Sequence, residues 1–215
     1  NYKYLFLVLI AMLVSFSATS QVTADFTTIT STTGCGSLVV EFKDLSVGGP
    51  TSWLWDFGNG NTSTLKNPIA IYNTGGVYDI TLKVSDLITA DSVTAISLVE
   101  VYEKPIAALE LSSAAAGCMP LNVSFEDFSN TNTSIVSWQW DFGDGGASSI
   151  QNPSYTYISS GQYSVSLFVV DVNGCQSLAT EVDLVEVNIA PIADFSTDIA
   201  FSCDSSELVL FSNSS

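Results

Sequence analysis

The residues of this chain that could carry chemistry are its carboxylates and its four cysteines. The sequence holds 22 Asp and Glu against five Lys, with no His and no Arg, and its formal net charge is −17. Without His, the chain has no imidazole base or metal ligand, so Ser–His–Asp and Cys–His arrangements are impossible. Five cations cannot neutralise many phosphates, which excludes nucleic-acid binding. We therefore expect no enzyme activity within this stretch of sequence.

Calcium binding is the one metal function that the carboxylates leave open. Ca²⁺ prefers oxygen ligands, and residues 105–190 carry nine acidic residues and no basic one. However, the segments DFGDG and DVNG do not match the DxDxDG calcium loop. A solvated acidic surface that favours solubility is the alternative. We expect no cofactor, and the carboxylates considered for Ca²⁺ are Asp141, Asp144, Asp171 and Asp183.

The N-terminus carries a short apolar run, residues 4–16, after the single charge of Lys3. Thirteen residues are fewer than the roughly 20 needed to cross a bilayer as a helix. The pattern predicts a helical secretory signal peptide over 1–20, with small residues before a cut at Gln21. A retained membrane anchor is the alternative. We expect the remainder to be secreted or displayed at the cell surface, with membrane contact only during export.

An internal repeat organises the rest of the chain. The segment WLWDFGNG (Trp53–Gly60) returns 85 residues later as WQWDFGDG (Trp138–Gly145), and a third copy starts near Pro191. The spacing predicts two full repeats, 21–103 and 106–188, and the truncated start of a third over 192–215. Two strands cannot close a sandwich, so we expect a fragment of a longer protein. The proline-bearing joints favour a stiff connection.

Alternation with a period of two dominates each repeat and predicts β-strands. Trp53, Trp55 and Phe57 share one face, and Leu54 and Asp56 point away. A later segment alternates in the same way, with Tyr163, Val165, Leu167 and Val169 on one face and Ser164, Ser166, Phe168 and Val170 on the other. About seven such strands per repeat indicate an all-β sandwich.

The combined motif, WDFG(N/D)G followed by NP and then by a Tyr-bearing strand, closely resembles the polycystic-kidney-disease (PKD) repeat. The resemblance covers nearly all of residues 21–188 and departs from the usual pattern at Asn59, where Asp is common. It implies tandem Ig-like, seven-stranded sandwiches. The motif and core residues that it identifies are Trp55, Asp56, Phe57, Gly58, Gly60 and Tyr78 in the first repeat, and Trp140, Asp141, Phe142, Gly143, Gly145 and Tyr163 in the second.

Four cysteines in a secreted chain suggest disulfides. In such a sandwich we expect Cys118, before the second strand, and Cys175, in a late hairpin, to lie at the same end and to form a disulfide. Cys35 matches Cys118 but has no partner in its own repeat, because Ala90 stands where Cys175 would be. Cys203 would then pair beyond Ser215. Four free, buried thiols are the alternative.

The expected function is non-catalytic. The resemblance implies extracellular repeats that serve as a stalk, an adhesion module or an interaction module for protein or polysaccharide in a larger bacterial protein. The alternative is an accessory module of a secreted protease or glycoside hydrolase whose catalytic domain lies beyond Ser215. Phe168 is a candidate contact residue, because it falls on the solvent face where the first repeat has Lys83. The ligand and the oligomeric state are not predictable from the sequence.

Overall fold

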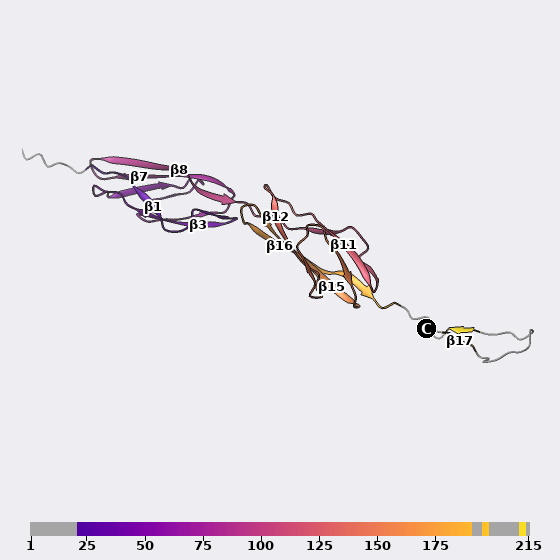
Figure 1. Ribbon diagram of the computed structural model, residues 1–215. Helices are drawn as coiled ribbons and strands as arrows, with labels where there is room; N and C mark the ends of the chain where they lie inside the picture. The colour runs from indigo at the N-terminus through magenta and orange to yellow at the C-terminus, as the bar shows by residue number, and fades with distance from the viewer. Residues whose placement is uncertain (1–20, 191–194, 198–210, 214–215) are drawn as a thin grey trace, which may run out of the picture. The chain divides into compact units, whose positions relative to one another are not determined.

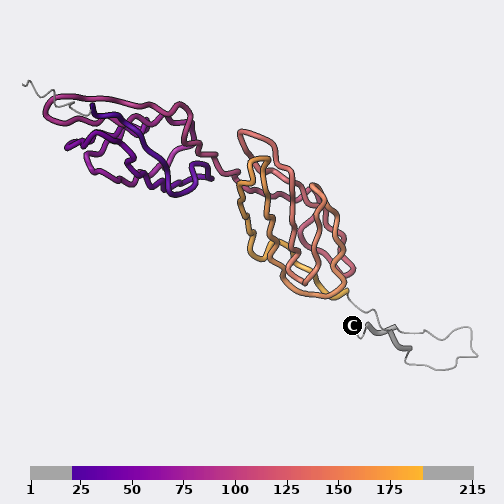
Figure 2. The backbone as a smooth tube through the Cα atoms, turned by 60° about the vertical axis from the view of Figure 1, so that its left-hand side comes forward, coloured from indigo at the N-terminus to yellow at the C-terminus, as the bar shows by residue number. Residues whose placement is uncertain are grey.

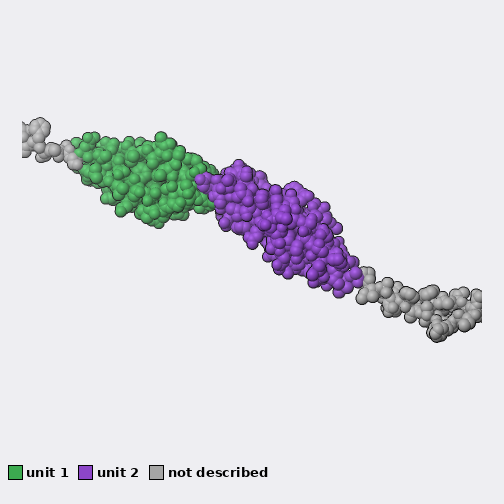
Figure 3. Space-filling model, in the orientation of Figure 1, with its two compact units in different colours: residues 1–101 green, residues 102–215 purple. Residues whose placement is uncertain are grey.

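The computed structural model describes residues 21–190 and two short segments, 195–197 and 211–213, and every regular element in these ranges is a β-strand (Figure 1). The same ranges hold no helix long and apolar enough to cross a membrane. Two compact units divide after Val101 (Figures 2 and 3). Each unit has its own hydrophobic core. The predicted signal peptide, residues 1–20, and Cys203 lie outside the described residues.

Unit 1 is a sandwich of a five-stranded sheet, ordered β2-β8-β7-β4-β5, and a three-stranded sheet, ordered β1-β3-β6. The neighbours β4–β7, β7–β8, β1–β3 and β3–β6 are antiparallel. The strands are β1 (Phe26–Thr28), β2 (Thr33–Cys35), β3 (Leu38–Asp44), β4 (Ser52–Asp56), β5 (Thr62–Ser63), β6 (Ile69–Tyr72), β7 (Gly76–Ser85) and β8 (Ala90–Tyr102).

Unit 2 repeats this topology with a five-stranded sheet, β10-β16-β15-β12-β13, and a three-stranded sheet, β14-β11-β9. Its strands are β9 (Leu109–Leu111), β10 (Ala116–Cys118), β11 (Leu121–Asp127), β12 (Ile135–Asp141), β13 (Ala147–Ser148), β14 (Ser154–Tyr157), β15 (Gly161–Asp171) and β16 (Gln176–Asn188). The order matches unit 1 strand by strand, so equivalent residues occupy equivalent places in the two sandwiches.

The predicted all-β, Ig-like sandwich is confirmed, and the count of strands has a simple explanation. Each unit has eight strand segments because its first strand is split between the two sheets. In unit 1, β1 pairs with β3, whereas β2 joins the edge of the other sheet beside β8. Counted once, the split strand gives the seven strands of the Ig-like pattern.

The core of each unit follows the predicted alternation. Trp55 and Trp140 are fully buried, and Ile80, Leu82 and Val84 face inward along β7. Phe26 and Phe42 pack against Trp55, with ring centroids 5.2 and 5.4 Å from it. Because buried aromatic side chains carry large apolar areas, this cluster supplies much of the stability of the sandwich.

A third copy of the first strand pairing follows β16. Strand β17 (Phe195–Thr197) pairs antiparallel with β18 (Phe211–Asn213), with Phe195 opposite Asn213. In unit 1, β1 and β3 pair with Phe26 opposite Asp44. The two hairpins use the same register, so the backbone pairing that opens unit 1 recurs after residue 190.

Candidate binding surface

The WDFG motif forms the turn that follows β4 in unit 1 and β12 in unit 2. Asp56 Oδ1 accepts a 2.9 Å hydrogen bond from the Gly58 amide, and Asp141 Oδ1 accepts the same bond from Gly143. Gly58 and Gly143 adopt φ values of +71° and +84°, which favour glycine. The motif is therefore a structural turn, and its carboxylates are engaged with backbone amides.

Asn59, which stands where Asp is usual, makes hydrogen bonds within its own turn and to the neighbouring strand β6. Asn59 Oδ1 accepts from the Asn61 amide at 3.0 Å, and its Nδ2 donates to the carbonyl of Ile71. In unit 2, Asp144 accepts from the Gly146 amide and from the Tyr155 hydroxyl, which lies 3.0 Å from both carboxylate oxygens. Burial and this carboxylate raise the pKa of Tyr155. Both residues thus close the same turn.

Two tyrosines in each unit anchor loops to the sandwich through hydrogen bonds from their hydroxyl groups to backbone carbonyls. The Tyr78 hydroxyl donates to the Thr74 carbonyl at 2.7 Å, and Tyr163 donates to Ser159 at 2.9 Å. This is the tyrosine corner of Ig-like folds. The buried Tyr157 hydroxyl donates to the Phe142 carbonyl, and burial raises the pKa of Tyr157. The aromatic motif residues are therefore structural.

The carboxylates considered for calcium are not assembled into a site. Asp171 is almost fully buried, and its Oδ1 accepts from the amides of Asn173 and Cys175 at 2.9 and 2.8 Å. Its role is to close the turn between β15 and β16. Within residues 21–190, no group of three or more His, Cys, Asp or Glu side chains is placed to hold a metal ion.

The predicted Cys118–Cys175 disulfide is wrong. Cys118 is a free, exposed thiol, whereas Cys35 and Cys175 are each disulfide-bonded. Cys118 lies opposite Asn188 at the end of β16, whereas Cys175 directly precedes that 13-residue strand. A strand of this length spans roughly 40 Å, and a disulfide needs Cα atoms within about 7 Å. The two cysteines are thus at opposite ends of unit 2.

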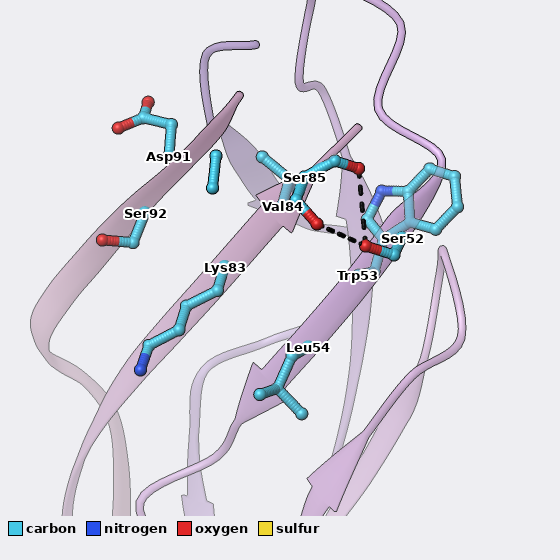
Figure 4. A pocket seen from close by; sticks show the side chains of 9 residues that line it. Ser52, Trp53, Leu54, Lys83, Val84, Ser85, Asp91 and Ser92 are labelled. Carbon is cyan, nitrogen blue, oxygen red and sulfur yellow. Dashed lines mark hydrogen bonds between the residues drawn. The ribbon is translucent and has the colours of Figure 1, made fainter. Parts of the chain in front are cut away.

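A hollow of about 550 Å³ lies on unit 1 beside the ends of β4, β7 and β8 (Figure 4). The Ser52 and Ser85 hydroxyls are 2.6 Å apart within it, and Asp91 Oδ2 accepts from the Ala24 amide at 2.8 Å. Figure 4 shows Lys83 and Leu54 on adjacent strands. The lining residues are Ser52, Trp53, Leu54, Lys83, Val84, Ser85, Ala90, Asp91 and Ser92.

Trp53, beside this hollow, and its counterpart Trp138 in unit 2 differ in the hydrogen bonding of their indole N–H groups. The buried Trp53 Nε1 makes no hydrogen bond, while Lys66 Nζ lies 5.4 Å from the ring centroid and 3.8 Å from Asp44 Oδ2. In unit 2, Trp138 Nε1 donates to Asp127 Oδ2 at 2.6 Å. Burial opposes ionisation of Asp127, but hydrogen bonds from Ser129, Trp138 and Gln151 outweigh it and lower its pKa.

In unit 2 the outer face of β12, β15 and β16, which corresponds to the hollow of unit 1, has an apolar side chain at its centre. Phe168 is half-buried and lies between Gln139 on β12 and Leu178 on β16, and the Leu178 side chain is 62% exposed. Phe168 points to the same face as Ser166 and Val170, away from the core, as its alternation predicts. The outer-face patch, defined as Gln139, Phe168 and Leu178, combines two apolar groups with an amide. Sequence reasoning singled out Phe168 but missed Leu178, because only the strand register places it alongside.

Comparison with known proteins identifies these sandwiches. The family described as "PKD domain" matches residues 16–101 and 102–187. The chain belongs to the PKD domain family. PKD domains are non-catalytic modules.

Curated relatives of this PKD chain are bacterial. A microbial collagenase of Vibrio alginolyticus is 45% identical over 60 residues, which is 28% of this chain and 7% of the collagenase. The pre-pro-metalloprotease PrtV of Vibrio cholerae is 39% identical over 70 residues, 33% of this chain and 7% of that protein. This chain therefore spans only about 7% of the length of either relative.

Among solved structures, the PKD1 domain of Vibrio anguillarum Epp is 38% identical. The match covers 40% of this chain and 99% of that one, with a TM-score of 0.36. The PKD1 domain of Vibrio cholerae PrtV is 32% identical, over 39% of this chain and 98% of that one, with a TM-score of 0.34.

Proposed function

We propose that the two PKD domains are binding modules of a larger secreted or surface protein and that they hold an extracellular protein partner. The likeness to a collagenase and a metalloprotease carries this proposal, because proteins of both names act on proteins. The disulfide-bonded state of Cys35 and Cys175 supports export, since disulfides persist in oxidising compartments. A protease domain elsewhere in the same protein is part of the proposal.

The charge distribution sets the kind of partner. Residues 105–190 carry nine acidic side chains and no basic one, so this part of unit 2 has no cation to offset the negative charge. A partner with a basic surface would be attracted, and the attraction would weaken with salt. The outer-face patch offers the apolar contact that holds such a partner once it arrives.

Sedimentation with insoluble collagen tests the protein partner. We expect the purified chain to sediment with the fibres at low salt and to be released as salt rises. Leu178→Ser should weaken binding several-fold, whereas Ile150→Ser, at a side chain that is 66% exposed, is the matched control and should not. No binding to collagen, or equal loss in both variants, would contradict the proposal.

Polysaccharide is the second candidate, favoured by the serine-rich hollow of unit 1. Hydroxyl groups at Ser52, Ser85 and Ser92 beside apolar Leu54 match the mixed polar and apolar faces of a sugar ring. The same sedimentation assay with cellulose and chitin decides between the two candidates. Binding to the polysaccharides that is lost in Leu54→Ser would favour this second function over the first.

A further inference from the structure

Two aspartates hold equivalent places in the two units. Asp44 is the last residue of β3, and Asp127 is the last residue of β11. The Asp44 amide donates to Asn67 Oδ1 at 2.9 Å. The Asp127 amide donates in the same way to Asn152 Oδ1 at 2.9 Å. The residue before the asparagine is a lysine in unit 1 and a glutamine in unit 2. The two units therefore present the same carboxylate to different neighbours.

In unit 1 the neighbour is a cation, Lys66. Its Nζ lies 3.8 Å from Asp44 Oδ2 and 5.4 Å from the centroid of the Trp53 ring. An ammonium at these distances is attracted both by the carboxylate and by the electron-rich face of the indole. The Asp44 side chain is buried in this arrangement. Unit 1 thus holds a lysine side chain of its own against an acid and an indole.

In unit 2 the corresponding neighbour, Gln151, is neutral. Asp127 Oδ2 accepts hydrogen bonds from Trp138 Nε1 at 2.6 Å and from Gln151 Nε2 at 3.2 Å. These donors satisfy the carboxylate oxygen but do not neutralise its charge. The one cation of residues 102–190 is Lys104, and among the described residues it makes no ion pair. Asp127 is half-buried, so a cation can reach its carboxylate from solvent.

Asp127 and its two partners line a polar hollow of about 370 Å³. Ligand pockets range from roughly 300 to 1,000 Å³, so a hollow of this size suits one long side chain. Thr131 and Thr133 bring hydroxyl groups to its wall, and Asn130 brings an amide. The oxygens of these groups can accept hydrogen bonds from the three N–H donors of an ammonium.

We propose that this acid–indole hollow, defined as Asp127, Trp138 and Gln151, binds a lysine side chain of the protein partner. The incoming ammonium takes the place beside Asp127 that the Lys66 ammonium takes beside Asp44. The inference rests on the proposed function for the nature of the partner, and it adds the group through which the partner is held. The acidic surface of unit 2 attracts basic segments in general, and the hollow receives one ammonium from such a segment.

An NMR titration of the 215-residue chain with the blocked peptide acetyl-Gly-Lys-Gly-amide tests this site. Because Trp138 Nε1 donates to Asp127, its indole N–H signal reports on the carboxylate. At low salt we expect the Trp138 signal to shift until it saturates and the Trp53 signal to stay in place. The same peptide with an acetylated lysine, which carries no charge, should shift neither signal. No shift of the Trp138 signal, or an equal shift with the acetylated peptide, would contradict the proposal.

A variant that supplies the ammonium from within the chain tests the site without removing its acid. Gln151→Lys reproduces the arrangement of unit 1 and should weaken peptide binding at least tenfold. Ile158→Lys is the charge-matched control, at a side chain that is 76% exposed. Ile158 follows the residue that pairs with the start of β11, roughly 20 Å along that strand from Asp127. Ile158→Lys should leave binding nearly unchanged. Equal weakening by both variants would reduce the effect to general attraction and overturn the proposal.

The collagen sedimentation assay distinguishes a failure of this inference from a failure of the proposed function. A Trp138 shift without sedimentation of the chain would support the lysine site and refute collagen as the partner. Equal sedimentation of the natural chain and the Gln151→Lys variant would support the protein partner and refute the lysine site as the place where that partner is held.

Discussion

Alanine substitutions in the WDFGDG turn distinguish two destabilising effects that glycine avoids, namely the strain of a positive φ and a steric clash of the added Cβ. Gly143 and Gly145 adopt φ values of +84° and +92°, so both favour glycine on conformational grounds. Only Gly143 is also crowded, because a Cβ there would lie 2.4 Å from the Ser164 carbonyl oxygen, whereas a Cβ at Gly145 meets nothing within 4 Å. Both variants should therefore suffer the backbone strain, but only Gly143→Ala should also suffer the steric clash.

The magnitudes follow from these two terms. A left-handed conformation costs a non-glycine residue about 1–2 kcal/mol, which is the whole expected loss for Gly145→Ala. Relieving the clash at Gly143 requires the β15 backbone to move, and β15 pairs on both sides with β12 and β16. Overpacking of this kind costs about 1–3 kcal/mol more. We expect Gly143→Ala to lose about 2–5 kcal/mol in total.

Urea denaturation followed by tryptophan fluorescence measures both losses, with unit 1 as the internal reference. The equivalent pair in unit 1 is a replicate, because a Cβ at Gly58 would lie 2.6 Å from the Asp79 carbonyl oxygen and one at Gly60 meets nothing within 4 Å. Equal destabilisation by Gly143→Ala and Gly145→Ala, or by Gly58→Ala and Gly60→Ala, would refute the reasoning.

Three further predictions concern the same sandwiches. Trp140→Ala should destabilise unit 2 by about 3–5 kcal/mol through the cavity that it leaves; a negligible loss in thermal unfolding would place this ring in solvent. Tyr163→Phe should cost about 1 kcal/mol, because the corner hydrogen bond to Ser159 is lost; urea titration tests this, and an unchanged midpoint would contradict it. Because the folded-state pKa of Asp127 is lowered, its stabilisation should be complete above about pH 4 and lost as the pH falls further; Asp127→Asn should reduce the acid sensitivity of unfolding, and an identical pH profile would show that another carboxylate governs it.

The sequence predicts the architecture well because its strongest signals are local. The alternation of Trp53, Trp55 and Phe57 places them on one face, and the structure buries the last two. The turn glycines and their Asp partners follow from motif spacing in the same way. In each case the physical cause lies within a few residues of the position concerned.

The disulfide could not be predicted in this way, because it depends on three-dimensional direction. The sequence shows that Cys118 and Cys175 belong to one repeat, but it does not show that β16 separates them by its whole length. Leu178 was missed for a related reason, since its place beside Phe168 comes from strand register. The one available signal was the absence of a cysteine at Ala90, which already argued against a bond within each repeat.

The lengths of the strands bear on how tandem domains of similar sequence avoid pairing wrongly with each other. Neighbouring domains in one chain are present at high effective concentration, so exposed sheet edges invite strand exchange and aggregation. In the three-stranded sheets every edge strand has only three or four residues, whereas β10 covers just Glu186–Asn188 of the 13-residue β16, and β2, beside the 13-residue β8, has three residues. The short edges of the three-stranded sheets offer a misfolding neighbour few backbone hydrogen bonds, so strand exchange between domains is confined to the long outer edges of β8 and β16.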